Sequence, residues 1–222
     1  MKDVKSIDSR SLRSYSVNVL FRNILNQDQI DNISQLIRVL SRYMIMDRSM
    51  INIRAKNPIG LSYIQKAVNY GLVTELQYKN DEGQRNRFFF QLNVAGVYFA
   101  ENVGYKLNAM PLDTSRFDKQ KILTFNKWSI DRKYELDNAF PMRRKFDIFI
   151  CKLKETNIAA YYPKLTDKEK VINFIYKILN PKDEVIVPRD TIERQYQFET
   201  IDEPLMDYGN KTAGNEFSEI LE

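Results

Sequence analysis

The stretch Asn57–Tyr105 decides the fold, and it reads NPIGLSYIQKAVNYGLVTELQYKNDEGQRNRFFFQLNVAGVYFAENVGY. It opens with Asn57 and Pro58, an N-cap residue followed by proline at the first helical position. Helical spacing of apolar residues continues until Gly71, a residue type that commonly ends helices. The pattern therefore predicts an amphipathic helix that begins at Pro58 and stops before Gly71.

The two faces of this predicted helix carry different residues. At about 100° per residue, the apolar face comprises Gly60, Leu61, Ile64, Ala67 and Val68. The opposite, polar face comprises Ser62, Lys66 and Asn69, with Tyr63 and Gln65 at its sides. Such a face either offers hydrogen bonds to DNA bases and phosphates or is an ordinary solvated surface. The segment that follows favours contact with DNA.

Two strand-like runs follow the helix, Val73–Lys79 and Gln84–Leu92, and the sequence NDEG joins them as a hairpin turn. On the second run, Phe88, Phe90 and Leu92 share one face, while Arg85, Arg87 and Phe89 share the other. Lys79 lies across the turn from these arginines. The pattern predicts a ribbon that buries one face and lines the other with arginine, as a strand that touches DNA phosphates requires.

The helix and the ribbon together have the layout of a winged helix-turn-helix, whose recognition helix enters the DNA major groove. Upstream, apolar residues recur at helical spacing from Asp28 or Gln29 to Met44 and predict a core-facing helix. The next run, MDRSMINIRA, either forms a short helix capped by Asp47 or forms a strand, since Ile51 and Ile53 alternate with polar residues. Residues 1–14 are expected to form a flexible basic arm, and 16–26 a short amphipathic helix.

The run RNRFFFQLNVAGVYFAENVGYKL resembles the passage from wing to helix in winged-helix DNA-binding proteins. That passage contains an arginine, aromatic residues, a leucine, a helix cap and a glycine four residues beyond the leucine. Here these are Arg87, Phe88–Phe90, Leu92, Asn93 and Gly96. Members of the MarR-like group and of the plasmid replication-relaxation group are similar in this way, with threonine the more common cap. The resemblance covers roughly residues 30–107.

This resemblance implies a winged-helix DNA-binding domain that acts as a homodimer on double-stranded DNA. The residues expected at the DNA are polar or basic: Ser62, Tyr63, Gln65, Lys66, Asn69, Lys79, Arg85, Arg87, Arg48 and Arg54. The expected role is transcription regulation, or replication, transfer or partition of a plasmid or phage.

Composition excludes several classes of function. The 222 residues contain no histidine and one cysteine, Cys151, so the usual general base, an internal disulfide and a cysteine-based zinc site are absent. No cofactor, metal or catalytic activity is therefore expected. Asp147, Glu155, Asp183, Glu184 and Lys182 supply the residue types of a metal-dependent nuclease but no motif. With no membrane-length apolar run and a polar N-terminus, we expect a cytoplasmic protein.

Charge is distributed unevenly along the chain. Residues 195–222 contain seven acidic residues and one basic residue, Lys211, so their net charge is −6. Because the whole chain has a net charge of +5, residues 1–194 have a net charge of +11. A basic body suits a partner that is a polyanion, because lysine and arginine neutralise phosphates. The acidic tail is expected to be mobile or bound to a protein partner.

The second half is expected to form a smaller α+β domain over residues 112–194, after a boundary at Asn108–Pro111. Residues 114–136 read as one or two helices, and RRKFDIFICKLKE reads as a strand that is apolar on both faces. A capping box at Thr166–Glu169 starts a helix that ends near Asn180, and Asp183–Val187 reads as a short buried strand. The overall fold class is therefore α+β, with the winged helix at residues 15–107.

Two alternative functions remain open. Winged helices also serve as docking modules for proteins, and Ile59, Tyr63 and Phe89 are candidate apolar anchors for such a partner. The second alternative is a metal-dependent DNA-processing enzyme.

Overall fold

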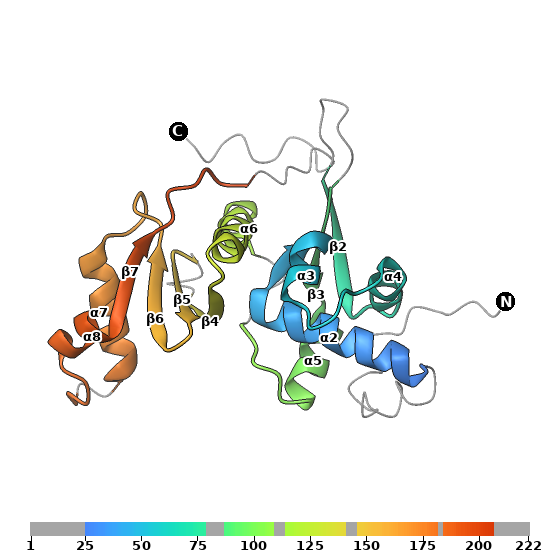
Figure 1. Cartoon of the computed structure of the whole chain (residues 1–222), viewed down its shortest axis with the longest axis horizontal. Coiled ribbons are helices and arrows are strands. Elements are labelled where there is room, and N and C mark those ends of the chain that lie inside the picture. The colour runs from blue at the N-terminus through green and yellow to red at the C-terminus, as the bar shows by residue number, and fades with distance from the viewer. Residues whose placement is uncertain (1–24, 79–86, 109–113, 141–145, 182–183, 207–222) are drawn as a thin grey trace. The chain divides into compact units, whose positions relative to one another are not determined.

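The computed structural model describes residues 25–78, 87–108, 114–140, 146–181 and 184–206, which form two compact units (Figure 1). The N-terminal unit includes residues up to Ser41 and Ile45–Tyr105, and the C-terminal unit includes Arg42–Met44 and Lys106–Met206. Helices and strands mix in both, so the fold class is α+β. The expected basic arm, most of the expected helix at 16–26 and most of the expected boundary at 108–111 lie outside the described residues.

In the N-terminal unit, the described residues form helices and a small three-stranded sheet. In chain order these are α2 (Gln27–Tyr43), β1 (Ile45–Asp47), α3 (Arg48–Arg54), α4 (Leu61–Asn69), β2 (Val73–Tyr78), β3 (Arg87–Leu92) and α5 (Val94–Asn102). The sheet order is β1-β3-β2, and both pairings are antiparallel. Helix α2 confirms the prediction of a core-facing helix, because Ile33, Leu36, Ile37 and Leu40 are all buried.

The sequence of MDRSMINIRA is compatible with a helix or a strand, and in the structure this run forms helix α3. The carboxylate of Asp47 caps α3 by accepting a hydrogen bond from the backbone N–H of Met50 at 2.8 Å. Met50 and Ile51 are buried, whereas Ile53 is exposed. The strand β1, only three residues long, precedes this helix and was not predicted.

Helix α4 begins three residues later than the sequence predicts. Gly60 is its N-cap, and Pro58 lies outside the helix. Asn57 lies three residues before this N-cap, and its backbone is hydrogen-bonded to the side chain of Gln35 in α2. The predicted end is correct, since Gly71 takes a positive φ of 68° directly after the helix.

Strand β3 is buried on both faces from Phe89 to Leu92, which corrects the expected position of Phe89 on an exposed face shared with Arg85 and Arg87. Phe90 and Leu92 are buried as predicted, but Phe89 and Gln91 on the opposite face are buried as well. The physical reason is that β3 is the central strand, and both α3 and α5 pack against it. Phe88, expected on the buried face, is exposed.

The Leu-Asn-x-x-Gly part of the sequence motif has a steric explanation. The side chain of Asn93 caps α5 by accepting from the Val94 N–H at 2.7 Å, and the Asn93 N–H donates to the carbonyl of Leu72 at 2.9 Å. A Cβ atom on Gly96 would lie 2.1 Å from that same carbonyl oxygen. Glycine is therefore required for α5 to pack this closely on the loop before β2.

The described residues of the C-terminal unit form one four-stranded sheet and three helices. In chain order the elements are α6 (Arg116–Asp131), β4 (Glu135–Phe140), β5 (Ile148–Leu153), β6 (Thr156–Tyr161), α7 (Lys168–Leu179), α8 (Arg189–Gln195) and β7 (Tyr196–Thr200). The sheet order is β4-β5-β6-β7, in which β4, β5 and β6 pair antiparallel and β6 and β7 pair parallel. Helices α7 and α8 form the crossover between the parallel strands.

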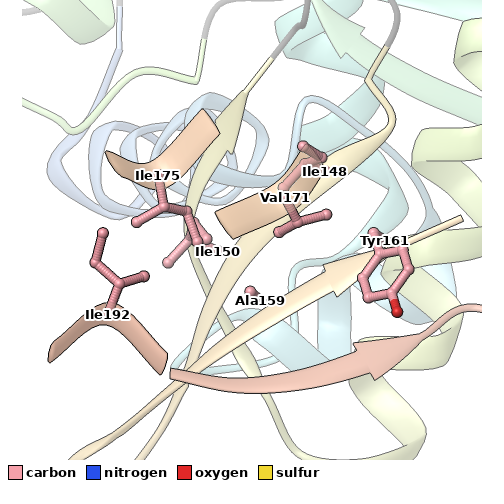
Figure 2. Packing of buried hydrophobic residues seen from close by; sticks show 7 residues of the cluster. All are labelled: Ile148, Ile150, Ala159, Tyr161, Val171, Ile175 and Ile192. Carbon is pink, nitrogen blue, oxygen red and sulfur yellow. The ribbon is translucent and has the colours of Figure 1, made fainter. Parts of the chain in front are cut away.

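Helices cover both faces of this sheet, which explains why β5 is apolar on both faces as predicted. Ile148 and Ile150 pack with Val171 and Ile175 of α7 and with Ile192 of α8 (Figure 2). Phe149 alternates with these residues and stacks on Phe125 of α6, with ring centroids 4.0 Å apart. Cys151 lies on the Phe149 side of the strand and is fully buried.

Three expectations for this half need correction at their edges. Residues 114–136 contain one helix, α6, and the last two residues of this range belong to β4. Asp167 caps α7 in place of Thr166 by accepting from the Lys170 N–H at 2.8 Å. Tyr196–Thr200, expected as the start of an acidic tail, is strand β7. The pairing of β7 with β6 places these residues in the sheet.

The predicted buried strand Asp183–Val187 is also wrong in its described part. Residues 184–187 form no strand, and Val185 and Ile186 are exposed by 64% and 67%. The buried side chain of Asn180 accounts for this geometry, because its oxygen accepts from the N–H groups of Ile186 and Val187. These backbone groups are then engaged with Asn180, and a strand ladder does not form.

Across the described ranges, no helix is long and apolar enough to cross a membrane.

Candidate nucleic-acid interface

Helix α4 presents a polar face to solvent, as its sequence predicts. Ser62, Gln65 and Asn69 are exposed and Lys66 is half-buried, while Ile64 and Ala67 on the opposite side are completely buried. The prediction is wrong for Leu61, whose side chain is half exposed at the first turn. The exposed face therefore carries a hydroxyl, two amides and an ammonium group, which are the groups that hydrogen-bond to base edges and phosphates.

The loop between α3 and α4 is held in place by side chains from α2 and α3. The Gln35 amide of α2 donates to the carbonyl of Asn57 at 2.8 Å and accepts from its N–H at 3.3 Å. The Asn52 side chain of α3 accepts from the Ile59 N–H at 2.9 Å, and Ile59 is buried. These bonds set the position of α4 relative to α2 and α3, so its polar face is held in a defined direction.

Tyr63 has a role within the unit. Its hydroxyl donates a hydrogen bond to the carboxylate of Asp28 in α2. This bond raises the pKa of Tyr63 above its ordinary value, because ionisation would place a negative charge beside Asp28. Of the sequence-predicted DNA contacts, Tyr63 is thus the one whose polar group joins α4 to α2.

The basic residues around α4 come from α3, the following loop and α4 itself. Arg48 is exposed at the first position of α3, and Arg54 is half-buried at the last. Lys66 lies in the last turn of α4. Lys56, which the sequence reasoning missed, is exposed in the loop between the two helices. The signal was available, since Lys56 lies only five residues before Leu61, where α4 begins.

The ribbon of β2 and β3 extends past the end of β1. Its described end pairs Tyr78 with Arg87 and Gln77 with Phe88. Arg87 therefore lies at the far end of β3, whereas Lys79, Arg85 and the turn Asn80–Gly83 lie outside the described residues.

The candidate apolar anchors for a docking partner are not where the sequence placed them. Ile59 and Phe89 are buried, with exposed fractions of 1% and 0%. Among the described residues of the unit, large hydrophobic side chains are exposed instead at Ile53, Leu61, Phe88, Val94 and Tyr98.

The residues weighed for a metal-dependent enzyme do not converge where the structure describes them. Asp147 lies directly before β5 and Glu155 lies beyond its other end, in the turn to β6. The carboxylate of Asp147 is 2.6 Å from the ammonium of Lys121, which also contacts Asp118 at 2.8 Å. Among the described residues, no group of three or more histidine, cysteine or acidic side chains could hold a metal ion. Lys182 and Asp183 lie outside these residues.

Two acids of the expected tail are engaged inside the C-terminal unit. Glu199 accepts a hydrogen bond from the Tyr134 hydroxyl at 2.6 Å, and Arg132 lies 3.5 Å from Glu203. Burial, followed by the bond to Glu199, raises the pKa of Tyr134 to about 12. The Met206 N–H donates to the Thr124 hydroxyl at 2.7 Å, so the chain is held against α6 up to this residue.

Comparison with known proteins adds no relative: no protein-family model, no curated protein and no solved structure matches this chain.

Proposed function

We propose that the chain binds double-stranded DNA in a sequence-specific manner, with α4 as the recognition helix and the β2–β3 ribbon as a wing. The observation that carries this proposal is the exposed polar face of α4, held by the Gln35–Asn57 and Asn52–Ile59 hydrogen bonds. A protein that reads a major groove needs a helix whose polar groups are outward and whose axis is fixed by its own unit.

The order of elements supports the same proposal. Helix, strand, helix, helix and then a two-stranded ribbon is the order expected of a winged helix-turn-helix. The sheet order β1-β3-β2 leaves the ends of β2 and β3 as a ribbon beyond β1, where a wing would contact the DNA backbone.

The predicted contact residues other than Tyr63, together with Lys56, have the following roles in this proposal. Ser62, Gln65 and Asn69 read base edges, because serine and amide side chains pair with base donors and acceptors. The cations Arg48, Lys56 and Lys66 bind phosphates, with Arg54 beside them at the end of α3. On the wing, Lys79, Arg85 and Arg87 add phosphate contacts.

The biological role proposed is that of a transcription regulator, or of a replication, transfer or partition factor of a plasmid or phage. A homodimer on a palindromic site would double the contacts made by each unit. The acidic residues after Met206 are proposed to recruit a protein partner. No catalytic step, cofactor or metal is part of the proposal.

Replacing Arg48, Lys56 and Lys66 together by alanine is expected to weaken binding to duplex DNA about 100-fold or more at low salt, since each lost phosphate contact costs on the order of tenfold. Fluorescence anisotropy with a labelled duplex measures the loss. The matched control replaces Lys127, Lys164 and Lys177, three exposed lysines of the C-terminal unit, and removes the same charge. Equal losses in both variants would show a net-charge effect and contradict a local interface.

A second candidate function is docking of a protein partner on the N-terminal unit. The exposed side chains of Ile53 and Leu61, 62% and 50% accessible, favour it, because they lie at the end of α3 and at the start of α4. Docking becomes the preferred function if the wild-type chain binds no duplex DNA in the same anisotropy experiment.

A further inference from the structure

The C-terminal unit contains a cavity of about 240 Å³ between the sheet and the last turns of α7. Its lining comes from all four strands and from α7, and comprises Asp137, Ile150, Lys152, Asn157, Ile175, Ile178, Leu179 and Tyr196. Lys152 and Ile178 are exposed to solvent, so the cavity is accessible from outside. This space is much larger than a single water molecule needs and suits a small organic molecule.

The polar wall of the cavity is a row of side chains across three strands. Lys152 of β5 pairs with Glu135 of β4 on one side and with Asn157 of β6 on the other, and Asn157 in turn pairs with Tyr196 of β7. The carboxylate of Glu135 is neutralised by the guanidinium of Arg42 at 3.2 Å. Directly paired residues project from the same face of a sheet, so an ammonium, an amide and a phenol lie side by side. Asp137 joins them from β4, where a bulge between Leu136 and Asn138 interrupts the pairing.

The rest of the lining is aliphatic, and it comes from Ile150 on the sheet and from three residues of α7. Ile150 and Ile175 belong to the core cluster between the sheet and α7, and Figure 2 shows their side chains close together. Ile178 and Leu179 continue this lining along α7. A ligand that fills the cavity must therefore carry an apolar body, with its polar group directed at the row of side chains on the sheet.

The charge of the polar wall determines the head group. The carboxylate of Asp137 is already neutralised by Lys106 at 2.5 Å. Lys152 has no ion-pair partner among the described residues, so its positive charge is available to a ligand. Asn157 and Tyr196 add an amide and a hydroxyl beside it. An anionic group that accepts hydrogen bonds matches this wall, whereas a cation would face Lys152.

We propose that this cavity is a binding site for a small monocarboxylate with a branched aliphatic or aromatic body. The carboxylate is held by Lys152 with Asn157 and Tyr196, and the body packs on Ile150, Ile175, Ile178 and Leu179. This assignment is independent of DNA binding, since every lining residue belongs to the C-terminal unit.

Isothermal titration calorimetry of the full chain with 4-methylpentanoate and with phenylacetate tests the proposal. Binding of at least one acid is expected, and the amine of the same carbon skeleton should bind much more weakly. Lys152→Ala should weaken binding about tenfold or more, because a charge-assisted bond is lost. The control Lys164→Ala changes another exposed lysine and should leave affinity unchanged.

Ile178→Ser tests the apolar wall without opening the core, since this side chain is partly exposed. This variant should bind both carboxylic acids more weakly than the wild type, although Lys152 is unchanged. No heat of binding for either acid at millimolar concentration would overturn the proposal. Equal affinity for acid and amine, or unchanged affinity in Lys152→Ala, would also overturn it.

Discussion

Replacing Lys121 by methionine is expected to lower the free energy of unfolding of the C-terminal unit by about 3–5 kcal/mol. The ammonium of Lys121 is 1% exposed and lies between the carboxylates of Asp147 and Asp118, at 2.6 and 2.8 Å. Methionine fills similar space but removes the positive charge. The largely buried carboxylate of Asp147 then loses its counter-ion in a site with little water. Urea denaturation followed by circular dichroism measures the change.

Lys127→Met is the matched control, because Lys127 lies on the same helix with its side chain exposed. It should change stability by no more than about 0.5 kcal/mol. The double variant Lys121→Met with Asp147→Leu should recover part of the loss, since it removes the unpaired charge as well. If Lys121→Met is as stable as the control, the ion pairs of Lys121 with Asp118 and Asp147 do not exist as described.

Replacing Gly96 by alanine is expected to destabilise the N-terminal unit by about 3 kcal/mol, the upper part of the range for overpacking. The added Cβ would lie 2.1 Å from the carbonyl oxygen of Leu72, which is backbone and cannot rotate away. Helix α5 must then move, and the bond from the Asn93 N–H to the same carbonyl is strained. Chemical denaturation monitored by circular dichroism measures the loss.

Gly60→Ala provides the comparison. Its nearest neighbour would be the flexible side chain of Tyr63 at 3.4 Å, and its backbone φ of −62° suits alanine. The expected cost is below about 1 kcal/mol, mainly from the change at the N-cap. Equal stability of Gly96→Ala and Gly60→Ala would mean that α5 does not approach Leu72 closely, and the steric explanation of the motif would fail.

The sequence predicted the elements whose signals are local. Helix α2 shows a long apolar stripe, α3 has the cap Asp47, and β5 is apolar on both faces. Helical spacing also placed Ser62 and Asn69 correctly on the exposed face of α4. These features depend on residues close together in the chain.

The features that the sequence missed depend on partners outside the segment itself. Phe89 is buried because β1, more than 40 residues earlier, makes β3 a central strand. Val185 and Ile186 read as a strand by composition, yet the side chain of Asn180 binds their loop. Residues 196–200 are acidic in part, and their place in the sheet comes from parallel pairing with β6. Periodicity within one segment carries no information on such contacts.

The dependence of DNA affinity on salt tests the central claim most directly. The wild-type chain and the Arg48, Lys56 and Lys66 triple variant are titrated with a duplex of about 30 base pairs between about 50 and 300 mM salt. For the wild type, we expect log affinity to fall with log salt with a slope of about −4 or steeper, and the triple variant should lose about 2 to 3 units of that slope. No binding by the wild type at the lowest salt, or a slope that the triple variant leaves unchanged, would contradict a DNA interface at α3 and α4.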